Sequence, residues 1–176
     1  MTAAERYEGR SVLVTGAQGF IGGWLAERLL DAGASVIALQ RDVEPESRFH
    51  TDGIDERCTL ARADLLDYEA LVRTLNEHEV SAVFHLAAQT IVSTANRSPL
   101  STFETNVRGT WLLLEACRSM GVVGSAIERV VVASSDKAYG DHEELPYRED
   151  FALQPRFPYD VSKACTDLIA RSYAHT

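Results

Sequence analysis

The chain has 176 residues, of which 45% are hydrophobic and 24% are charged, and its formal net charge is -9 at pH 7. This length is enough for one sizeable hydrophobic core but short for two complete domains, so we predict one domain over residues 1–176. The acidic balance excludes a protein that follows a nucleic-acid backbone, because such proteins need clustered Lys and Arg.

The cysteines and the N-terminus indicate where such a protein works. Cys58, Cys117 and Cys165 are widely spaced and form no CxxC or Cys/His cluster, which predicts neither a disulfide framework nor a metal site. Residues 1–10 are polar without an apolar signal core, and no apolar run approaches the ~18 residues that a membrane span needs. We therefore expect a cytoplasmic protein without a membrane segment.

Short apolar runs alternate with longer amphipathic stretches along the chain. Strands are predicted at 11–15, 35–40, 58–62, 81–86 and 128–134. Helices are predicted at 20–31, from the N-cap Asp67 to about 79, at 99–120 and at 158–175, and residues 41–56 are predicted as a polar segment. This alternation, with strands of Val, Ile and Leu, predicts an α/β fold of the Rossmann type, a doubly wound parallel sheet with helices on both faces.

The predicted helix over 99–120 has the longest amphipathic pattern. Its apolar residues recur at a mixed spacing of three and four, which indicates one continuous helix that ends at Gly121. These residues are Phe103, Val107, Trp111, Leu114 and Cys117.

A glycine-rich turn, TGAQGFIG at 15–22, follows the first predicted strand and leads into the first helix. Gly16 permits the tight turn, Gly19 lets the backbone approach a pyrophosphate, and Gly22 allows the helix to pack close to the strand. The helix N-terminus then offers N–H groups and a partial positive charge to the phosphates. This position in the chain favours a dinucleotide site over an ordinary glycine-rich turn.

The choice of dinucleotide depends on the end of the second strand, where an acidic residue would hold the ribose of NAD. Gln40 stands there, followed by Arg41 and Asp42. Arg41 would pair with the 2′-phosphate of NADP unless it is only an exposed loop charge, and Asp42 would reach the ribose of NAD. Asp64 is placed either to meet the adenine edge or to cap the following helix. We expect NAD, with NADP left open.

A tyrosine and a lysine, Tyr159 and Lys163, stand four residues apart in YDVSK and therefore project from one helix face. A phenol is a poor base at neutral pH, and the Lys163 ammonium would stabilise its phenolate. The alternative is an ordinary surface pair. Because carboxyl ends of parallel strands line one crevice, we expect the glycine turn, 85–89 and 134–137 to meet there. His85 ends an apolar strand and is expected to be a core histidine.

These residues together resemble the extended short-chain dehydrogenase/reductase family, and within it the nucleotide-sugar epimerases and dehydratases. The matching segments are TGAQGFIG at 15–22, HLAAQ at 85–89, TNVRGTWLLLEA at 105–116, SSDKAYG at 134–140 and YDVSK at 159–163. The resemblance implies a nucleotide-sugar substrate and a homodimer formed by the two long helices. The apolar residues compatible with that dimer are Trp111, Leu112, Leu168 and Ile169. Family members continue into a C-terminal substrate domain, which we expect to be missing here.

The segment after the fifth predicted strand is most similar to that of CDP-glucose 4,6-dehydratases, in which Lys follows Asp. This resemblance implies that Tyr159 takes the proton of the sugar 4-hydroxyl while Ser135 holds that oxygen. It also implies that Lys137 or a neighbour removes the C5 proton while Asp136 protonates the departing 6-hydroxyl. Lys163 completes the catalytic set. The alternative for Asp136 and Lys137 is that they only cap the loop or pair with each other.

Together, the glycine turn and the resemblance imply a set of dinucleotide-contacting residues. The set is Gly16, Gln18, Gly19, Phe20, Ile21, Gly22, Arg41, Asp64, Leu65, Leu86, Ala87, Ala88, Gln89, Tyr159 and Lys163. Two other functions remain open: a 4-epimerase or reductase on the same scaffold, and a non-catalytic dinucleotide-binding module.

Overall fold

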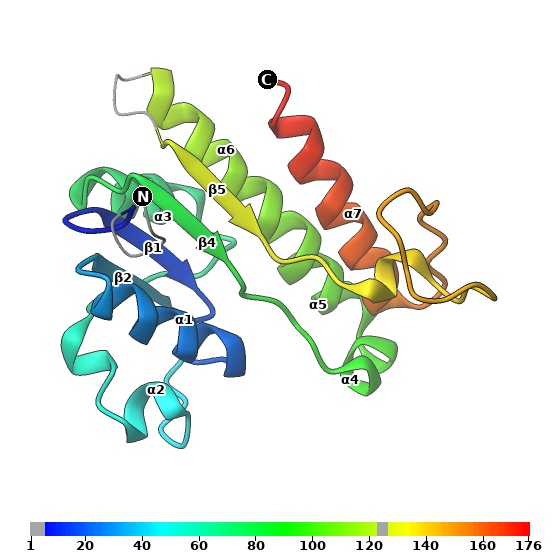
Figure 1. Cartoon of the computed structure of the whole chain (residues 1–176), viewed down its shortest axis with the longest axis horizontal. Helices are drawn as coiled ribbons and strands as arrows, with labels where there is room; N and C mark the ends of the chain where they lie inside the picture. Colours follow the sequence, from blue (N-terminus) through cyan, green and yellow to red (C-terminus); the bar gives the residue numbers. More distant parts are fainter. Residues whose placement is uncertain (1–5, 123–126) are drawn as a thin grey trace.

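A parallel sheet of five strands forms the centre of the chain (Figure 1), with the strand order β3-β2-β1-β4-β5. The computed structural model describes residues 6–122 and 127–176, so positions 1–5 and 123–126 of the predicted domain lie outside the described residues. The strands are β1 Ser11–Thr15, β2 Ser35–Gln40, β3 Thr59–Arg62, β4 Ala82–His85 and β5 Arg129–Val132. The predicted Rossmann-type sheet is confirmed, and its last three strands are shorter than predicted.

Helices connect these strands. They are α1 Phe20–Asp31, α2 Arg48–Thr51, α3 Tyr68–Glu77, α4 Val92–Arg97, α5 Pro99–Phe103, α6 Gly109–Val122 and α7 Pro158–Tyr173. The described residues also form two short 3-10 helices, η1 Asp55–Arg57 and η3 Asp136–Tyr139, and one π-helix, η2 Glu104–Arg108. Within the described ranges, no helix is long and apolar enough to cross a membrane.

Helices cover both faces of the sheet, as predicted. Side chains alternate along a strand, so Val12 and Val14 of β1 face one side and Leu13 faces the other. The first side packs under α1 and α2, whose buried residues include Leu29 and Phe49. The second side packs under α3 and α6. Burial on both faces explains why β1 and β2 are almost continuously apolar.

The order of the strands fixes where a ligand crevice lies. β2 pairs with one edge of β1 and β4 with the other. The strands β2 and β3 are therefore added on one side of β1 and the strands β4 and β5 on the other, so the strand order reverses between β1 and β4. In open α/β sheets, ligands bind outside the carboxyl ends of the strands at this point. Thr15 and His85 are partners in the register, so the residues that follow them, Gly16 and Leu86, begin side by side.

The predicted helix over 99–120 is interrupted rather than regular. The π-helix η2 separates α5 from α6, and the helix continues through Gly121 to Val122, so the predicted end was wrong. At its beginning the buried residues are the polar Thr102, Asn106 and Thr110, and Trp111 is 41% exposed. This end of the helix packs against α7 through small polar side chains that hydrogen bond across the contact.

The polar segment 41–56 contains two short helices, α2 and η1, that the sequence analysis did not predict. Phe49 and Ile54 are fully buried beneath α1 and hold this segment against the first core. Two isolated apolar residues carry no periodic pattern, so their burial is not visible in the sequence.

Candidate functional site

The glycine turn leaves no room for side chains at two positions. Gly16 has a φ of 75°, and a Cβ there would lie 2.7 Å from the backbone N of Ala87. A Cβ at Gly22 would lie 2.0 Å from the Gly16 carbonyl oxygen. The N-cap of α1 is Gly19, which makes no side-chain cap, so the first N–H groups of the helix are available to an anion.

Near this turn, two apolar side chains are exposed and one polar side chain forms hydrogen bonds to another loop. Phe20 and Ile21 are 87% and 66% exposed, which leaves an apolar surface beside the helix N-terminus. The Gln18 side chain is engaged instead with the loop after β2. Its Nε2 donates to the Asp42 carbonyl oxygen at 2.7 Å, and its Oε1 accepts from the Glu44 N–H at 2.7 Å. Gln18 therefore joins the turn to that loop.

At the end of β2, Arg41 and Asp42 pair with each other on the surface. The Arg41 Nε lies 2.5 Å from an Asp42 carboxylate oxygen, and this hydrogen bond raises the pKa of Arg41. Asp64 caps its own turn, since its carboxylate accepts from the Leu66 N–H at 2.9 Å. The buried Leu65 side chain packs on Gly109 in the second core. The contacts of Asp64 are those of a cap on the turn just before α3, whose own N-cap is Asp67, and the contact of Asp64 with adenine stays a prediction.

His85 is a buried histidine with both nitrogens bonded, as predicted. Its Nδ1 lies 2.7 Å from the Thr15 hydroxyl and its Nε2 lies 3.0 Å from the Thr110 hydroxyl. Burial, with a smaller contribution from the Lys163 charge, lowers the pKa of His85 to about 3. The ring is therefore neutral at physiological pH and cannot serve there as a cation.

The segment after β4 is held against the glycine turn by the same threonine. The Thr15 oxygen accepts from the N–H groups of Leu86 and Ala87 at 3.2 and 3.1 Å. Because this oxygen accepts twice, its own proton goes to His85 Nδ1, which leaves Nε2–H to donate to Thr110. Predicted contact residues 86–89 therefore lie next to the turn. Ala88 is half-buried in this segment.

A buried amide, Asn106, connects three parts of the site and was missed by the sequence analysis. Its Oδ1 accepts from the Gln89 N–H at 2.7 Å, and its Nδ2 donates to the Gln89 carbonyl and to the Ser162 hydroxyl. Ser162 in turn donates to the Tyr159 carbonyl at 2.7 Å. The available signal was two polar pairs at helical spacing, Asn106 with Thr110 and Ser162 with Thr166.

Tyr159 and Lys163 stand one turn apart on α7, which starts with Pro158 in its first turn. Tyr159 is half-buried, while Lys163 is 6% exposed and its pKa is lowered by burial. The Lys163 ammonium donates to the carbonyl of Ala133, which directly follows β5. This bond places the tyrosine–lysine face of α7 at the carboxyl end of the sheet.

The remaining predicted catalytic residues follow Ala133 along the chain. Ser135 caps η3 by accepting from the Lys137 N–H at 3.2 Å, and its hydroxyl donates to the Asp136 carboxylate at 3.1 Å. Asp136 and Lys137 are exposed. Gly140 ends this segment with a φ of 75°, and a Cβ there would lie 2.1 Å from the Gln154 carbonyl oxygen. The segment that carries the predicted catalytic residues is therefore fixed against the chain that leads into α7.

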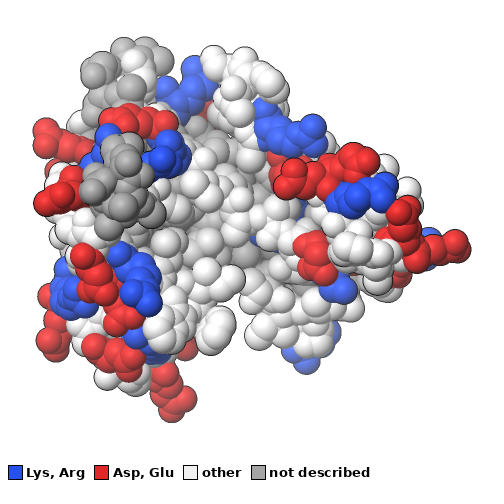
Figure 2. Space-filling model, viewed as in Figure 1, with Lys and Arg blue, Asp and Glu red and all other residues white. Residues whose placement is uncertain are grey.

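The carboxyl ends of β1, β4 and β5 thus bring together the glycine turn, 86–89, Ser135 and the start of α7. Figure 1 shows α1 and α2 on one side of these strand ends and α4, α5 and α7 on the other. In the same view, Figure 2 shows a notch at the lower edge between the two sides, bordered by uncharged residues. Charged residues gather instead toward the left and right margins.

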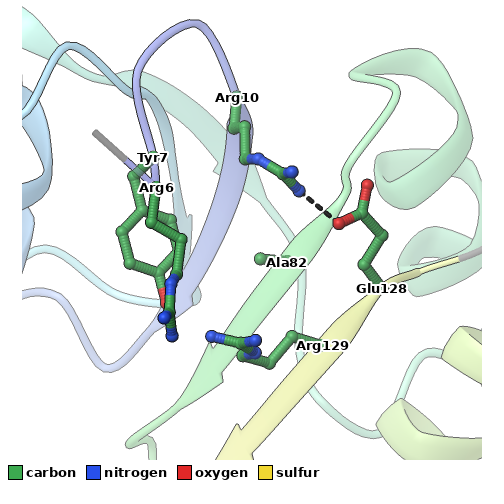
Figure 3. A pocket seen from close by; sticks show the side chains of 6 residues that line it. All are labelled: Arg6, Tyr7, Arg10, Ala82, Glu128 and Arg129. Atoms are coloured by element: carbon green, nitrogen blue, oxygen red, sulfur yellow. Dashed lines mark hydrogen bonds and ion pairs between the residues drawn. The ribbon is translucent and has the colours of Figure 1, made fainter. Parts of the chain in front are cut away.

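A separate cavity of about 180 Å³ lies at the opposite end of the sheet (Figure 3). It is lined by Arg6, Tyr7, Arg10, Ala82, Glu128 and Arg129, and Arg10 pairs with Glu128. The five-residue β1 spans roughly 16 Å and separates this cavity from the glycine turn. Among the described residues, no group of three or more His, Cys, Asp or Glu is arranged to hold a metal ion.

Comparison with known proteins gives a family match over most of the chain. Residues 13–176 match the family model described as GDP-mannose 4,6 dehydratase. Among curated proteins, the CDP-glucose 4,6-dehydratase of Salmonella typhimurium is 35% identical over 97% of this chain, and the UDP-glucose 4-epimerase of Erwinia amylovora is 34% identical over 93%. The chain spans only 47% and 48% of those two relatives.

Solved structures agree with this match. The dTDP-glucose 4,6-dehydratase of Streptomyces venezuelae, solved with NAD bound, has a TM-score of 0.83 and 33% identity over 94% of this chain and 52% of its own. The UDP-glucose 4-epimerase of Brucella ovis, also in complex with NAD, has a TM-score of 0.82 and 28% identity over 96% of this chain and 49% of its own. Dehydratases and epimerases both match, so the comparisons do not separate the two reactions.

Proposed function

This chain belongs to the GDP-mannose 4,6-dehydratase family, and on this premise we propose that it carries the dinucleotide-binding and catalytic part of an NAD-dependent nucleotide-sugar 4,6-dehydratase. One observation carries the proposal: Lys163 bonds to the end of β5, shares a helix face with Tyr159, and lies beside the strand end from which Ser135 and Asp136 continue. The substrate is a nucleoside-diphosphate hexose of the CDP-glucose type, supported by the Asp136-Lys137 pair and by the similarity to a CDP-glucose 4,6-dehydratase.

The glycine turn fits a dinucleotide. A diphosphate needs close approach to backbone N–H groups, and the turn provides it where Gly16 and Gly22 exclude any side chain and Gly19 leaves the start of α1 uncapped. Phe20 and Ile21 offer exposed apolar surface beside it. When bound, NAD supplies the hydride acceptor that oxidation of a sugar hydroxyl requires. NADP remains a second candidate because Gln40 ends β2 where an acidic residue would hold the ribose of NAD, and Arg41 follows it.

Tyr159, Lys163 and Ser135 act on the sugar 4-hydroxyl. The Tyr159 phenolate takes the hydroxyl proton, and the Lys163 ammonium one turn away stabilises the phenolate. Ser135 holds the same oxygen by a hydrogen bond. Asn106 acts through Ser162, whose hydroxyl bonds to the Tyr159 carbonyl and so positions the start of α7.

Asp136 and Lys137 act on the 4-ketone that this oxidation forms. The ketone makes the neighbouring C5 proton acidic, and Lys137 removes that proton. The electrons of the broken C5–H bond form the C5–C6 double bond as the C6–O bond breaks, and Asp136 gives its proton to the departing hydroxyl, which leaves as water. The hydride taken from C4 would then return to C6 while Lys137 returns its proton to C5, so the net change is the loss of one water. Both side chains are exposed at the start of η3, which leaves them accessible to a substrate.

A 4-epimerase is the second candidate, favoured by the 34% identity to the UDP-glucose 4-epimerase of Erwinia amylovora. That reaction uses Tyr159 and Lys163 and needs no acid for loss of water. The two candidates therefore differ in what they require of Asp136.

Mass spectrometry of nucleotide sugars separates these functions. CDP-, dTDP-, UDP- and GDP-hexoses are incubated with the protein and NAD or NADP, and loss of one water from one of them is expected. Asp136→Asn should abolish this loss, and Tyr159→Phe is the matched variant that should abolish any reaction on the sugar. Unchanged masses with interconverted isomers would establish the epimerase. Unchanged sugars with bound NAD would establish a non-catalytic binding module.

We further propose that residues 1–176 form one domain. We also propose that the protein is a cytoplasmic homodimer whose two copies contact each other through α6 and α7. Trp111 and Leu168 support this because both are large apolar side chains exposed on these helices. Leu112, by contrast, packs against the second core and is explained without a partner. Light scattering should give twice the chain mass, and Leu168→Glu should give the monomer.

A further inference from the structure

A polar cluster lies behind the glycine turn and takes no part in the proposed chemistry. His50 of α2 is at its centre, with Asp55 of η1 on one side and with Gln18 and Gln40 on the other. The His50 side chain is only 17% exposed. Gln18 belongs to the glycine turn and Gln40 ends β2, so His50 contacts both segments that flank the adenosine end of the proposed dinucleotide site.

The orientation of the Gln18 amide is fixed by its other two partners. Its nitrogen faces the Asp42 carbonyl, which only accepts, and its oxygen faces the Glu44 N–H, which only donates. Reversing the amide would place oxygen against oxygen and N–H against N–H. The Gln18 Oε1 therefore faces the His50 Nε2, at 3.0 Å, and needs a donor there.

The other ring nitrogen of His50 also faces an acceptor. Nδ1 lies 2.8 Å from the Asp55 carboxylate, which accepts only. A ring that donates from both nitrogens is an imidazolium, and its bonds to Asp55 and Gln18 are charge-assisted. In the neutral ring that keeps Nδ1–H on Asp55, Nε2 carries a lone pair. That lone pair repels the Gln18 oxygen and accepts instead from Gln40 Nε2, which lies 3.3 Å away.

Asp55 supplies the carboxyl group that lies in direct contact with the His50 ring. On α2 itself, Arg48 forms ion pairs with both Glu27 of α1 and Asp52, at 2.8 and 3.0 Å, so the two carboxylates more than balance its charge. In the loop after β2, Arg41 and Asp42 neutralise each other, and Glu44 presents its backbone N–H to Gln18. The Phe49 ring meets the His50 ring edge to face at 5.3 Å.

We propose that His50 is a proton-dependent positioning residue for the adenosine end of the dinucleotide site. As an imidazolium it holds Gln18, and through Gln18 it holds the loop 41–44 beside the glycine turn. As a neutral ring it releases Gln18 and bonds to Gln40, so the loop that carries Arg41 and Asp42 loses one of its anchors. This inference rests on the proposed dinucleotide function. Because the dinucleotide prefers the form with protonated His50, it binds more tightly at low pH. At a pH where the ring of the free protein is neutral, binding is accompanied by the uptake of a proton.

Isothermal titration calorimetry of NAD across about pH 5.5–8.5 tests this proposal. The dissociation constant of the wild-type chain should rise about tenfold across this range, which corresponds to about 1.4 kcal/mol. His50→Gln should bind with a dissociation constant that does not change with pH, because its amide donates to Gln18 at every pH. His175→Gln, which removes an exposed histidine just after α7, is the matched control and should keep the wild-type profile.

Two results would overturn the inference, and they are distinct from failure of the proposed function. A pH profile of His50→Gln that follows the wild type would remove His50 from this role, as would a flat wild-type profile. Absence of NAD binding by the wild type at every pH would refute the dinucleotide function itself. Nitrogen NMR of the His50 ring gives a separate readout: both nitrogens should be protonated at low pH, and a ring with one bare nitrogen there would contradict the geometry.

Discussion

Two adjacent glycines of α1 should respond in opposite ways to the same substitution. A Cβ at Gly22 would lie 2.0 Å from the Gly16 carbonyl oxygen, whereas a Cβ at Gly23 would lie 3.5 Å from the Ala17 carbonyl oxygen, an ordinary contact. Both positions are buried in the same helix. Gly22→Ala and Gly23→Ala therefore differ in a single respect, the approach of the helix to the glycine turn.

The magnitudes follow from this difference. Alanine in place of glycine inside a helix stabilises the folded state by about 0.5–1 kcal/mol, and Gly23→Ala should show this gain. At Gly22 the helix would have to move by roughly 1 Å to restore a tolerable contact with the backbone of the turn. Overpacking of this kind costs about 1–3 kcal/mol and exceeds the helical gain. It also displaces the N–H groups proposed to bind the diphosphate.

Thermal unfolding and NAD titration measure both effects. For a domain of this size, each 1 kcal/mol shifts the melting temperature by about 2–4 °C. Gly22→Ala should melt lower and bind NAD at least about tenfold more weakly, a loss of about 1.4 kcal/mol. Gly23→Ala should melt higher with unchanged NAD affinity. A Gly22→Ala variant that melts and binds like the wild type would refute the close approach of α1 to the turn.

Three further predictions test separate parts of the site. Lys163→Met should lower turnover of the nucleotide sugar by about 100-fold or more, because the proposed role of Lys163 is to stabilise the Tyr159 phenolate. The affinity for NAD should change less than about tenfold. Unchanged turnover in a steady-state assay would contradict that role. Burial lowers the pKa of His85 to about 3 in the folded chain, so as the pH falls the unfolded chain binds a proton at this residue before the folded chain does. The free energy of unfolding should therefore decrease as the pH falls from about 6.5 toward 3, by about 1.4 kcal/mol per pH unit. Urea denaturation of His85→Gln should show a shallower pH dependence than the wild type, and an equal slope would show that His85 is not the group responsible. Asn106→Ala removes the hydrogen-bond partner of the Gln89 N–H and of the Ser162 hydroxyl, and it should lower the free energy of unfolding by about 2–4 kcal/mol. A decrease below about 0.5 kcal/mol in the same denaturation assay would mean that the hydrogen bonds of Asn106 do not hold the site together.

The part of the fold that local pattern determines was predictable from the sequence. The bounds of β1, α1 and β2 agree with prediction because each apolar run is framed by glycine or polar residues. Asp67 was predicted to cap α3, and its carboxylate accepts from the Ala70 N–H at 3.0 Å. The meeting of Gly16 with Ala87 also follows from topology, since both come after neighbouring parallel strands.

The parts that depend on contacts distant in sequence were not predictable. Asn106 and His50 are single polar residues without a motif, and their importance comes from partners such as Ser162 and Gln18 on other elements. The contact of Gln18 with the cofactor stays a prediction, but the bonds of its side chain to the loop after β2 were not predictable, because they depend on that loop folding back over the turn. Which residues of α6 face α7 likewise depends on packing that no local periodicity encodes.

The most direct test of the proposed dinucleotide site at the carboxyl ends of β1, β4 and β5 is calorimetric titration of the wild-type chain with NAD. We predict saturable binding of one NAD per chain, which Gly22→Ala weakens and Gly23→Ala leaves unchanged. No detectable binding at NAD concentrations up to about 1 mM, or binding that Gly22→Ala leaves unaltered, would contradict the assignment of this edge of the sheet as the cofactor site.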